Sequence, residues 1–441
     1  MNVPAGMSRG LWLGILAALA TWTMAVAWLL RFPCHQLGWN GSRTQQLLCY
    51  SDIGLLYGTR GMADGHFAYF SQDPSALLEY PVLQSLVAAV TGQAAHGIAG
   101  DLPVHAAQSI YFDLNAVLLL LVWLAIVLVV ARLVPAPRYA LALAVSPAVA
   151  ATGLINWDLW PVLCAVLALL VLRREHWVLG GVLLGLGAAF KLWPFIMLGA
   201  VLVLAIRRRR ARPAVLAFAG AVLAWLVANV PFALADPEQW GHFWSFSGQR
   251  GAGFSSVYDV WNRLAGSYLG LEPLTADTIN VLAYGAFALL CAGILAVGLL
   301  ARREPTLEEL SLLIVAAFVV TNKVYSPQFV LWLVPLVILA RPRLREYAVW
   351  QAVEVFHWAV VFSWLFVYIE SRPTVETATL VYGAAVALHV LAVLWLCARV
   401  VGRLLAGRAE AGRHGPPRPG PPRHRTSRDA GERRGAVESP A

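Results

Sequence analysis

The chain has 441 residues, of which 59% are hydrophobic and only 13% are charged. An average soluble domain carries about 25% charged residues, so this composition excludes an ordinary globular protein, a disordered chain and a disulfide-framed secreted domain. Apolar runs of roughly 15 to 25 residues recur along nearly the whole length, as in chains with many membrane-spanning helices. The sequence therefore predicts an all-α polytopic membrane protein.

The charge balance is basic, with 33 Lys and Arg against 24 Asp and Glu, a net charge of +9. Residues 402–441 hold nine arginines and four acidic residues, so this tail supplies five of the nine excess charges. Basic loops beside membrane spans are typical of the positive-inside rule, and we expect no nucleic-acid partner. Only two of the basic residues are lysines, Lys191 and Lys323.

Twelve apolar segments are candidate spans, and several are short for a full crossing, which is typical of tilted, broken or cavity-lining helices. They lie at residues 11–30, 110–132, 139–154, 157–172, 177–190, 194–206, 213–232, 278–300, 307–321, 328–340, 347–369 and 377–400. We expect a weaker patch at 81–90 to enter the outer leaflet without crossing. Residues 1–401 then form one transmembrane domain, and the Pro- and Arg-rich residues 402–441 a disordered cytoplasmic tail.

Arginine placement predicts the orientation in the plasma membrane. The run Arg207–Arg210 is the strongest cytoplasmic signal, and twelve spans then put both termini in the cytoplasm. The long loops at 31–108 and 234–275 would lie outside. Cys34 and Cys49, in the first of these loops, have a spacing that suits a disulfide in an extracytoplasmic segment. Two unpaired thiols are the alternative.

The polar residues that remain are concentrated on this outer face. Asp52, beside Tyr50, could act as general base on an acceptor hydroxyl, although a single loop carboxylate is more often a helix cap or a solvated charge. Lys191 and Lys323 both fall in outer turns, where two positive charges suit an anionic substrate such as a phosphate ester. For Lys191, snorkelling to the surface is the alternative.

The loop at 234–275 interleaves aromatic residues with amide and charged side chains, Arg250 among them. Rings that cover the apolar faces of sugars and forked polar groups that bind hydroxyls are the components of sugar-binding clefts. A loop that packs its own tryptophans at the membrane interface fits the same pattern.

A series of motifs in this order resembles glycosyltransferase family 87, over roughly residues 10 to 400. They are residues 50–53 (YSDI), 79–83 (EYPVL), 111–115 (YFDLN) and 155–158 (INWD), the turn at Lys191, and 322–328 (NKVYSPQ). Members of that family are polytopic enzymes with a GT-C fold, and they include polyprenol-phosphate-mannose-dependent α-mannosyltransferases. The resemblance implies a GT-C-like fold with about 12 transmembrane helices and a long first extracytoplasmic loop.

The same resemblance implies roles for individual residues. Asp52 would deprotonate the acceptor hydroxyl, which displaces a polyprenyl phosphate with inversion at the sugar. Lys191, Lys323 and Arg250 would bind the departing phosphate, so that neither a metal nor another cofactor is required. Six further residues are expected to bind the acceptor or support the base: Glu79, Tyr80, Asn156, Asp158, Tyr325 and Gln328.

The substrates expected from the resemblance are a polyprenyl-phosphate sugar, with mannose as the sugar, and a cell-envelope glycolipid or glycan as acceptor. Membrane lipid is the remaining partner. A pentose such as arabinose on the same carrier stays open as an alternative. So does a transporter or flippase of lipid-linked sugars, which predicts polar residues at mid-span and internal repeats; the sequence shows neither clearly.

Overall fold

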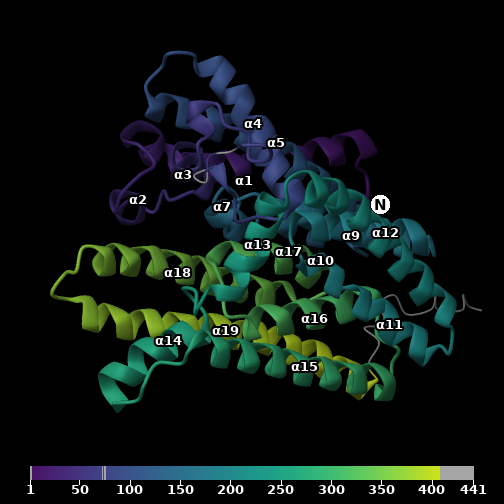
Figure 1. Ribbon diagram of the computed structural model, residues 1–441. Coiled ribbons are helices and arrows are strands. Elements are labelled where there is room, and N and C mark those ends of the chain that lie inside the picture. The colour runs from purple at the N-terminus through teal and green to yellow at the C-terminus, as the bar shows by residue number, and fades with distance from the viewer. Residues whose placement is uncertain (1, 72, 74–75, 408–441) are drawn as a thin grey trace, which may run out of the picture. The chain divides into compact units, whose positions relative to one another are not determined.

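The computed structural model describes residues 2–71, 73 and 76–407, and this part of the chain is helical throughout, without strands (Figure 1). The helices are α1 (Arg9–Leu37), α2 (Arg43–Gln46), α3 (Asp52–Thr59), α4 (Val82–Ala99), α5 (Val104–Leu133), α6 (Pro137–Ala144), α7 (Pro147–Thr152), α8 (Leu159–Leu172), α9 (Trp177–Phe190), α10 (Trp193–Ile196), α11 (Leu198–Arg207), α12 (Ala211–Ala235), α13 (Pro237–Gln249), α14 (Val257–Leu264), α15 (Ala276–Leu300), α16 (Leu307–Thr321), α17 (Val330–Leu339), α18 (Leu344–Ile369) and α19 (Val375–Ala406). Short helical turns are η1 (Met62–Asp64), η3 (Ala265–Leu269) and η4 (Pro327–Phe329).

Six described helices are long and apolar enough to cross a membrane: α1, α5, α12, α15, α18 and α19. The other expected spans are helical but shorter, and two of them are split. The segment 139–154 becomes α6 and α7, which break before Pro147, and 194–206 becomes α10 and α11. A membrane protein is therefore confirmed, whereas the count of twelve spans and the orientation stay predictions.

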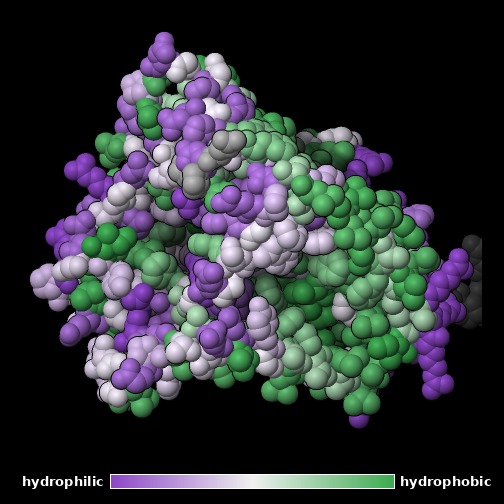
Figure 2. Space-filling view, viewed as in Figure 1, coloured by the Kyte–Doolittle hydropathy of each residue, from purple (hydrophilic) through white to green (hydrophobic). Residues whose placement is uncertain are grey.

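The short helices are the most deeply buried. Every residue of α17 is buried, as are nearly all residues of α16, because other helices surround both. By contrast, only 11% of the most apolar window of α15 is buried. Figure 2 shows a broad hydrophobic surface on the side of α11 and α12, as expected of helices that face lipid.

Close backbone contact joins α9 to α12. A Cβ atom added at Gly181 would lie 2.0 Å from the carbonyl oxygen of Ala217, and one added at Gly185 would lie 2.2 Å from that of Ala221. Small residues four apart on one helix allow such close approach, which is how helices associate without a hydrophobic driving force in lipid.

The expected outer loop at 31–108 is shorter and more ordered than its polar sequence indicates. α1 continues to Leu37 and α5 begins at Val104, while α4 extends the weak patch at 81–90 into an 18-residue helix after Pro81. A disulfide joins Cys34, near the end of α1, to Cys49. The segment 234–275 folds into α13 and α14. α19 runs on to Ala406, past the predicted start of the tail at 402, and residues 408–441 lie outside the described residues.

Candidate active site

Asp52 opens helix α3, and two contacts attach this helix end to the turn before α8. Ser51 caps the helix, since its Oγ accepts from the backbone N–H of Ile53, and it also donates to the carbonyl of Leu154 at 2.7 Å. The backbone N–H of Asp52 donates to the carbonyl of Ile155 at 2.8 Å. Asp52 is therefore fixed by main-chain contacts to a segment about one hundred residues later.

Both oxygens of the Asp52 carboxylate accept hydrogen bonds. The Tyr50 hydroxyl donates to Oδ1 at 2.6 Å, and Asn156 Nδ2 donates to Oδ2 at 2.7 Å. The same amide donates to the Tyr80 hydroxyl oxygen at 2.8 Å. Asn156 thus connects the two motifs of the first outer segment, and the arrangement orients a carboxylate as a general base requires.

Burial raises the pKa of Asp52, although the hydrogen bonds from Tyr50 and Asn156 and the charge of Lys191 oppose this shift. Burial and the neighbouring Asp52 charge also raise the pKa of Tyr50 and of Tyr80. Both phenols consequently stay protonated at neutral pH. A carboxylate that is protonated more easily than usual is better matched to taking up a proton near neutrality.

Asp158, whose side chain is fully buried, and Lys191, whose side chain is 14% exposed, form an ion pair beside this carboxylate. Lys191 Nζ lies 2.7 Å from Asp158 Oδ1, which also accepts from Trp332 Nε1 at 2.7 Å. The ammonium faces the rings of Phe329 and Trp332, at 5.5 and 5.8 Å from their centroids. Its charge is therefore largely balanced within the protein.

Lys323 and Arg250 form a second cationic group, and no carboxylate of the described residues balances its charge. Lys323 Nζ donates to Asn280 Oδ1 at 2.7 Å and to the carbonyl of Gly248 at 3.3 Å. Neither cation has an ion-pair partner among the described residues. Burial and the repulsion from Arg250 lower the pKa of Lys323, and the charge of Arg250 also reaches Tyr50. Two unbalanced cations beside the Asp52 group suit an anionic ligand.

Three other expected site residues have different surroundings. Glu79 is held by Arg60 through two 3.2 Å hydrogen bonds, and its charge acts on Asp52 and Tyr80. Tyr325 is fully buried against His389, with the two rings 4.1 Å apart. Gln328 is buried in η4, and no hydrogen bond among the described residues joins its side chain to the Asp52 group.

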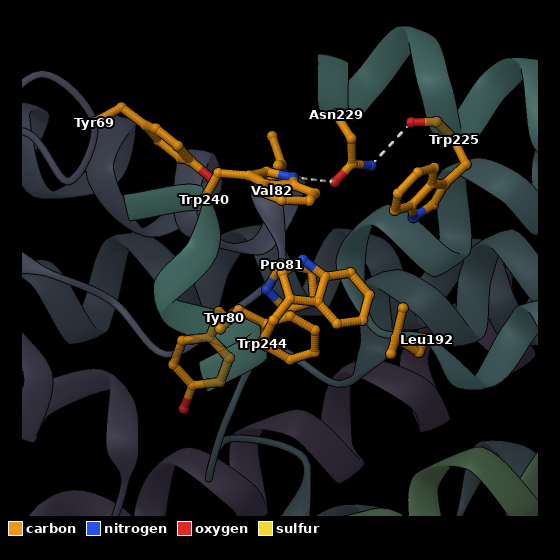
Figure 3. Close-up of a pocket in the computed structure, with 10 residues that line it drawn as sticks. Tyr69, Tyr80, Pro81, Val82, Leu192, Trp225, Asn229, Trp240 and Trp244 are labelled. Carbon is orange, nitrogen blue, oxygen red and sulfur yellow. Dashed lines mark hydrogen bonds between the residues drawn. The ribbon is translucent and has the colours of Figure 1, made fainter. Parts of the chain in front are cut away.

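A narrow pocket lies between α4, α12 and α13 and shares Tyr80 with the Asp52 group. It is lined mainly by aromatic side chains: Tyr69, Tyr80, Pro81, Val82, Leu192, Trp225, Asn229, Trp240, Phe243 and Trp244. Figure 3 shows the Tyr80 hydroxyl pointing away from the other labelled residues, and Trp240 donating to Asn229. The surface is hollowed beside α13 (Figure 2). An apolar ligand in this pocket would have one end beside Tyr80.

Sequence reasoning missed several partners of the site. Asn280 and Trp332 had no motif around them, and only the three-dimensional contacts identify them. It also overlooked Glu354, His357 and His389, which lie in the middle of α18 and α19 and are fully buried. Polar residues at mid-span therefore do occur, in contrast to the reading of the sequence.

A family model described as glycosyltransferase family 87 matches residues 80–321. No curated protein matches the chain.

Proposed function

The chain belongs to glycosyltransferase family 87, and from this premise we propose that it transfers a sugar from a polyprenyl phosphate to a cell-envelope glycolipid or glycan. The observation that carries the proposal is the Asp52 carboxylate, which Tyr50 and Asn156 hold from both sides. Mannose is the proposed sugar, on the resemblance to polyprenol-phosphate-mannose-dependent enzymes.

In the proposed reaction, the Asp52 carboxylate takes the proton of an acceptor hydroxyl. The oxygen then attacks the anomeric carbon of the donor from the face opposite the phosphate. The bond between that carbon and the phosphate oxygen breaks, and polyprenyl phosphate leaves with the electron pair. A β-linked donor gives an α-glycoside, and the proton stays on Asp52 until water removes it.

We assign the departing phosphate first to Lys323 and Arg250, because no carboxylate in the described part of the chain balances their charges. Cations placed where charge develops lower the barrier without a metal. Lys191, whose partner is Asp158, contributes mainly through its field on Asp52. Asn280 then acts as the support that orients Lys323.

The pocket beside α13 offers a site for the first isoprene units of the donor. Its lining is aromatic, and it borders the exposed apolar face of α12, where Leu234 is 80% exposed. A chain arriving from lipid would pass Trp244 and Leu192 and bring its phosphate toward Tyr80. This arrangement supports lateral access for a lipid-linked substrate.

An outward-facing site is part of the same proposal. The disulfide between Cys34 and Cys49 lies three residues from Asp52 along the chain, and disulfides persist in oxidising compartments. The arginine-rich turn at 207–210 follows the end of α11, whereas Lys191 lies just before α10, at the other end of this helical segment. The positive-inside rule favours the cytoplasm for the arginine-rich end. Reporters fused after Arg210 and near Gly248 should read inside and outside, respectively.

The test is transfer of label from polyprenyl-phosphate mannose in membranes, with wild type compared with Asp52→Asn at matched protein level. We expect label in an envelope glycolipid with wild type and a loss of roughly 10²- to 10⁴-fold with the variant. Substantial turnover by Asp52→Asn would refute the base assignment. If wild type is inactive with polyprenyl-phosphate mannose but active with a polyprenyl-phosphate pentose, mannose is the wrong sugar, while the assignment as a polyprenyl-phosphate-dependent glycosyltransferase stands.

A further inference from the structure

A cluster of three ionisable side chains lies in the hydrophobic middle of the α18–α19 pair, which runs side by side in Figure 1. Glu354 and His357 are three residues apart on α18, so they share one face of that helix, and His389 faces them from α19. All three are buried, with exposed fractions of 3%, 0% and 0%. One ligand atom from each lies within 4.8 Å of the others.

These side chains carry more polar atoms than the described surroundings satisfy. Glu354 Oε1, both ring nitrogens of His357 and both of His389 lack a hydrogen bond. His389 Nδ1 does lie 2.7 Å from Glu354 Oε2, but outside hydrogen-bond geometry. A buried polar group without a hydrogen-bond partner destabilises the folded protein, and water is scarce at this depth in a membrane protein. Several such groups in one place point to a ligand that they share.

The donor set identifies the chemical class of that ligand. Two imidazoles and one carboxylate are the three-residue set with which Zn²⁺ is bound in many proteins, at about 2.0–2.2 Å from each donor. From these contacts we propose that Glu354, His357 and His389 bind a divalent zinc-like metal ion. The phenol of Tyr325 packs on His389, and its hydroxyl also lacks a partner, so this oxygen or a water would complete the coordination.

The imidazoles of His357 and His389 are stacked, with ring centroids 3.9 Å apart and planes within 2°. The nitrogen lone pairs lie in the planes of the rings, and these planes are parallel. The two imidazoles therefore cannot coordinate the same ion in this arrangement. Coordination therefore requires one ring to rotate about its Cβ–Cγ bond, which opens the stack. The donor atoms are already within 4.8 Å of one another, so this rotation needs no shift of either helix.

A metal ion at this site would hold α18, α19 and the segment of Tyr325 together. It connects α18 and α19 to Tyr325, two residues from Lys323, to which we assign the donor phosphate. A metal ion here would limit the motion of that segment without touching Asp52, because the hydrogen bonds of the described residues around Asp52 involve none of the three ligands. The ion is structural in this proposal, and the transfer step does not pass through it.

The test uses the full-length chain, purified in detergent with a tag that contains no histidine and stripped with a chelator. Co²⁺ replaces Zn²⁺ as the probe, because its visible absorption reports the ligand geometry. We expect saturable bands at one Co²⁺ per chain, which Zn²⁺ then removes by competition. His389→Gln and Glu354→Gln should each weaken Co²⁺ binding at least tenfold, whereas His105→Gln, an exposed histidine at the start of α5, should not.

A second readout guards against variants that fold poorly. Zn²⁺ should raise the melting temperature of wild type and of His105→Gln, but not that of Glu354→Gln or of a fallback variant, His357→Gln. Absence of saturable Co²⁺ bands in folded wild-type protein would overturn the proposal, as would bands that are unchanged in the folded variants. Because no sugar donor is present, this result is separate from the outcome of the transfer assay.

Discussion

The hydrogen bond from Asn156 to Asp52 yields a pH-dependent prediction. Asn156→Ala removes the Nδ2 donor that lies 2.7 Å from Asp52 Oδ2. Hydrogen bonds to charged groups contribute about 1.5–3 kcal/mol, which corresponds to roughly 10- to 150-fold in transfer rate at neutral pH. The lost donor stabilised the ionised carboxylate, so the variant should raise the pKa of Asp52 above its already raised value and leave less of the base ionised.

Because the pKa of Asp52 should rise in Asn156→Ala, the loss of activity should depend on pH. A base must be deprotonated to act, so activity falls as pH drops through the pKa of Asp52. In Asn156→Ala this acidic limb should move to higher pH, and the deficit should shrink as pH increases. Transfer is measured from a labelled donor between about pH 5 and pH 9, within the range in which perturbed carboxylates titrate.

The matched control is Asn262→Ala, which removes an amide on α14 that bonds to Leu274 and not to the Asp52 group. It should keep the wild-type profile. If the deficit of Asn156→Ala is the same at every pH, the amide positions substrate and does not tune the base. Wild-type rates in that variant would remove Asn156 from the site altogether.

Three further predictions concern stability. Asp158→Asn leaves the Lys191 ammonium, which is 14% exposed, without its carboxylate, which should cost up to about 3–5 kcal/mol and lower the melting temperature. The melting temperature should be partly restored when Lys191→Met is added, and no restoration would refute the pairing. Cys49→Ser opens a disulfide across a separation of 15 residues, worth about 3 kcal/mol, and dithiothreitol should lower the melting temperature of wild type but not of this variant. Gly185→Val should prevent α9 from packing on α12, whereas Gly285→Val, with open space around it, should express normally; similar expression of both would contradict the close contact.

The sequence predicts the helical segments well because apolar runs and their breakers are local signals. Asp158 directly precedes α8 and Lys191 directly follows α9, and the antiparallel packing of these two helices brings the two residues together. Their pairing could have been predicted from that hairpin. The motifs alone predict separate roles for the two residues, because a lysine in an outer turn is typical of an anion-binding site.

Other features depend on contacts that no local pattern contains. Asn280 accepts a hydrogen bond from Lys323 across 43 residues, and Trp332 donates to Asp158 across 174 residues. Tyr325 lay in a recognisable motif but packs on His389, away from the hydrogen bonds of Asp52. The sequence pattern does not reveal the buried residues Glu354, His357 and His389. Their neighbours in α18 and α19 are mostly apolar, so three polar residues change the average hydropathy of these two long helices very little.

Because tryptophans line the pocket beside α13, intrinsic tryptophan fluorescence can report whether a ligand occupies it. Indole emission shifts to shorter wavelength when water leaves the ring, and Trp244 is 38% exposed at the rim of the pocket. Trp193 and Trp332, by contrast, are stacked 5.3 Å apart and almost wholly buried, so their emission is already that of a dry environment. An isoprenoid tail that settles against Trp244 should therefore be visible in the fluorescence of unlabelled protein, and its affinity can be titrated before any sugar is transferred.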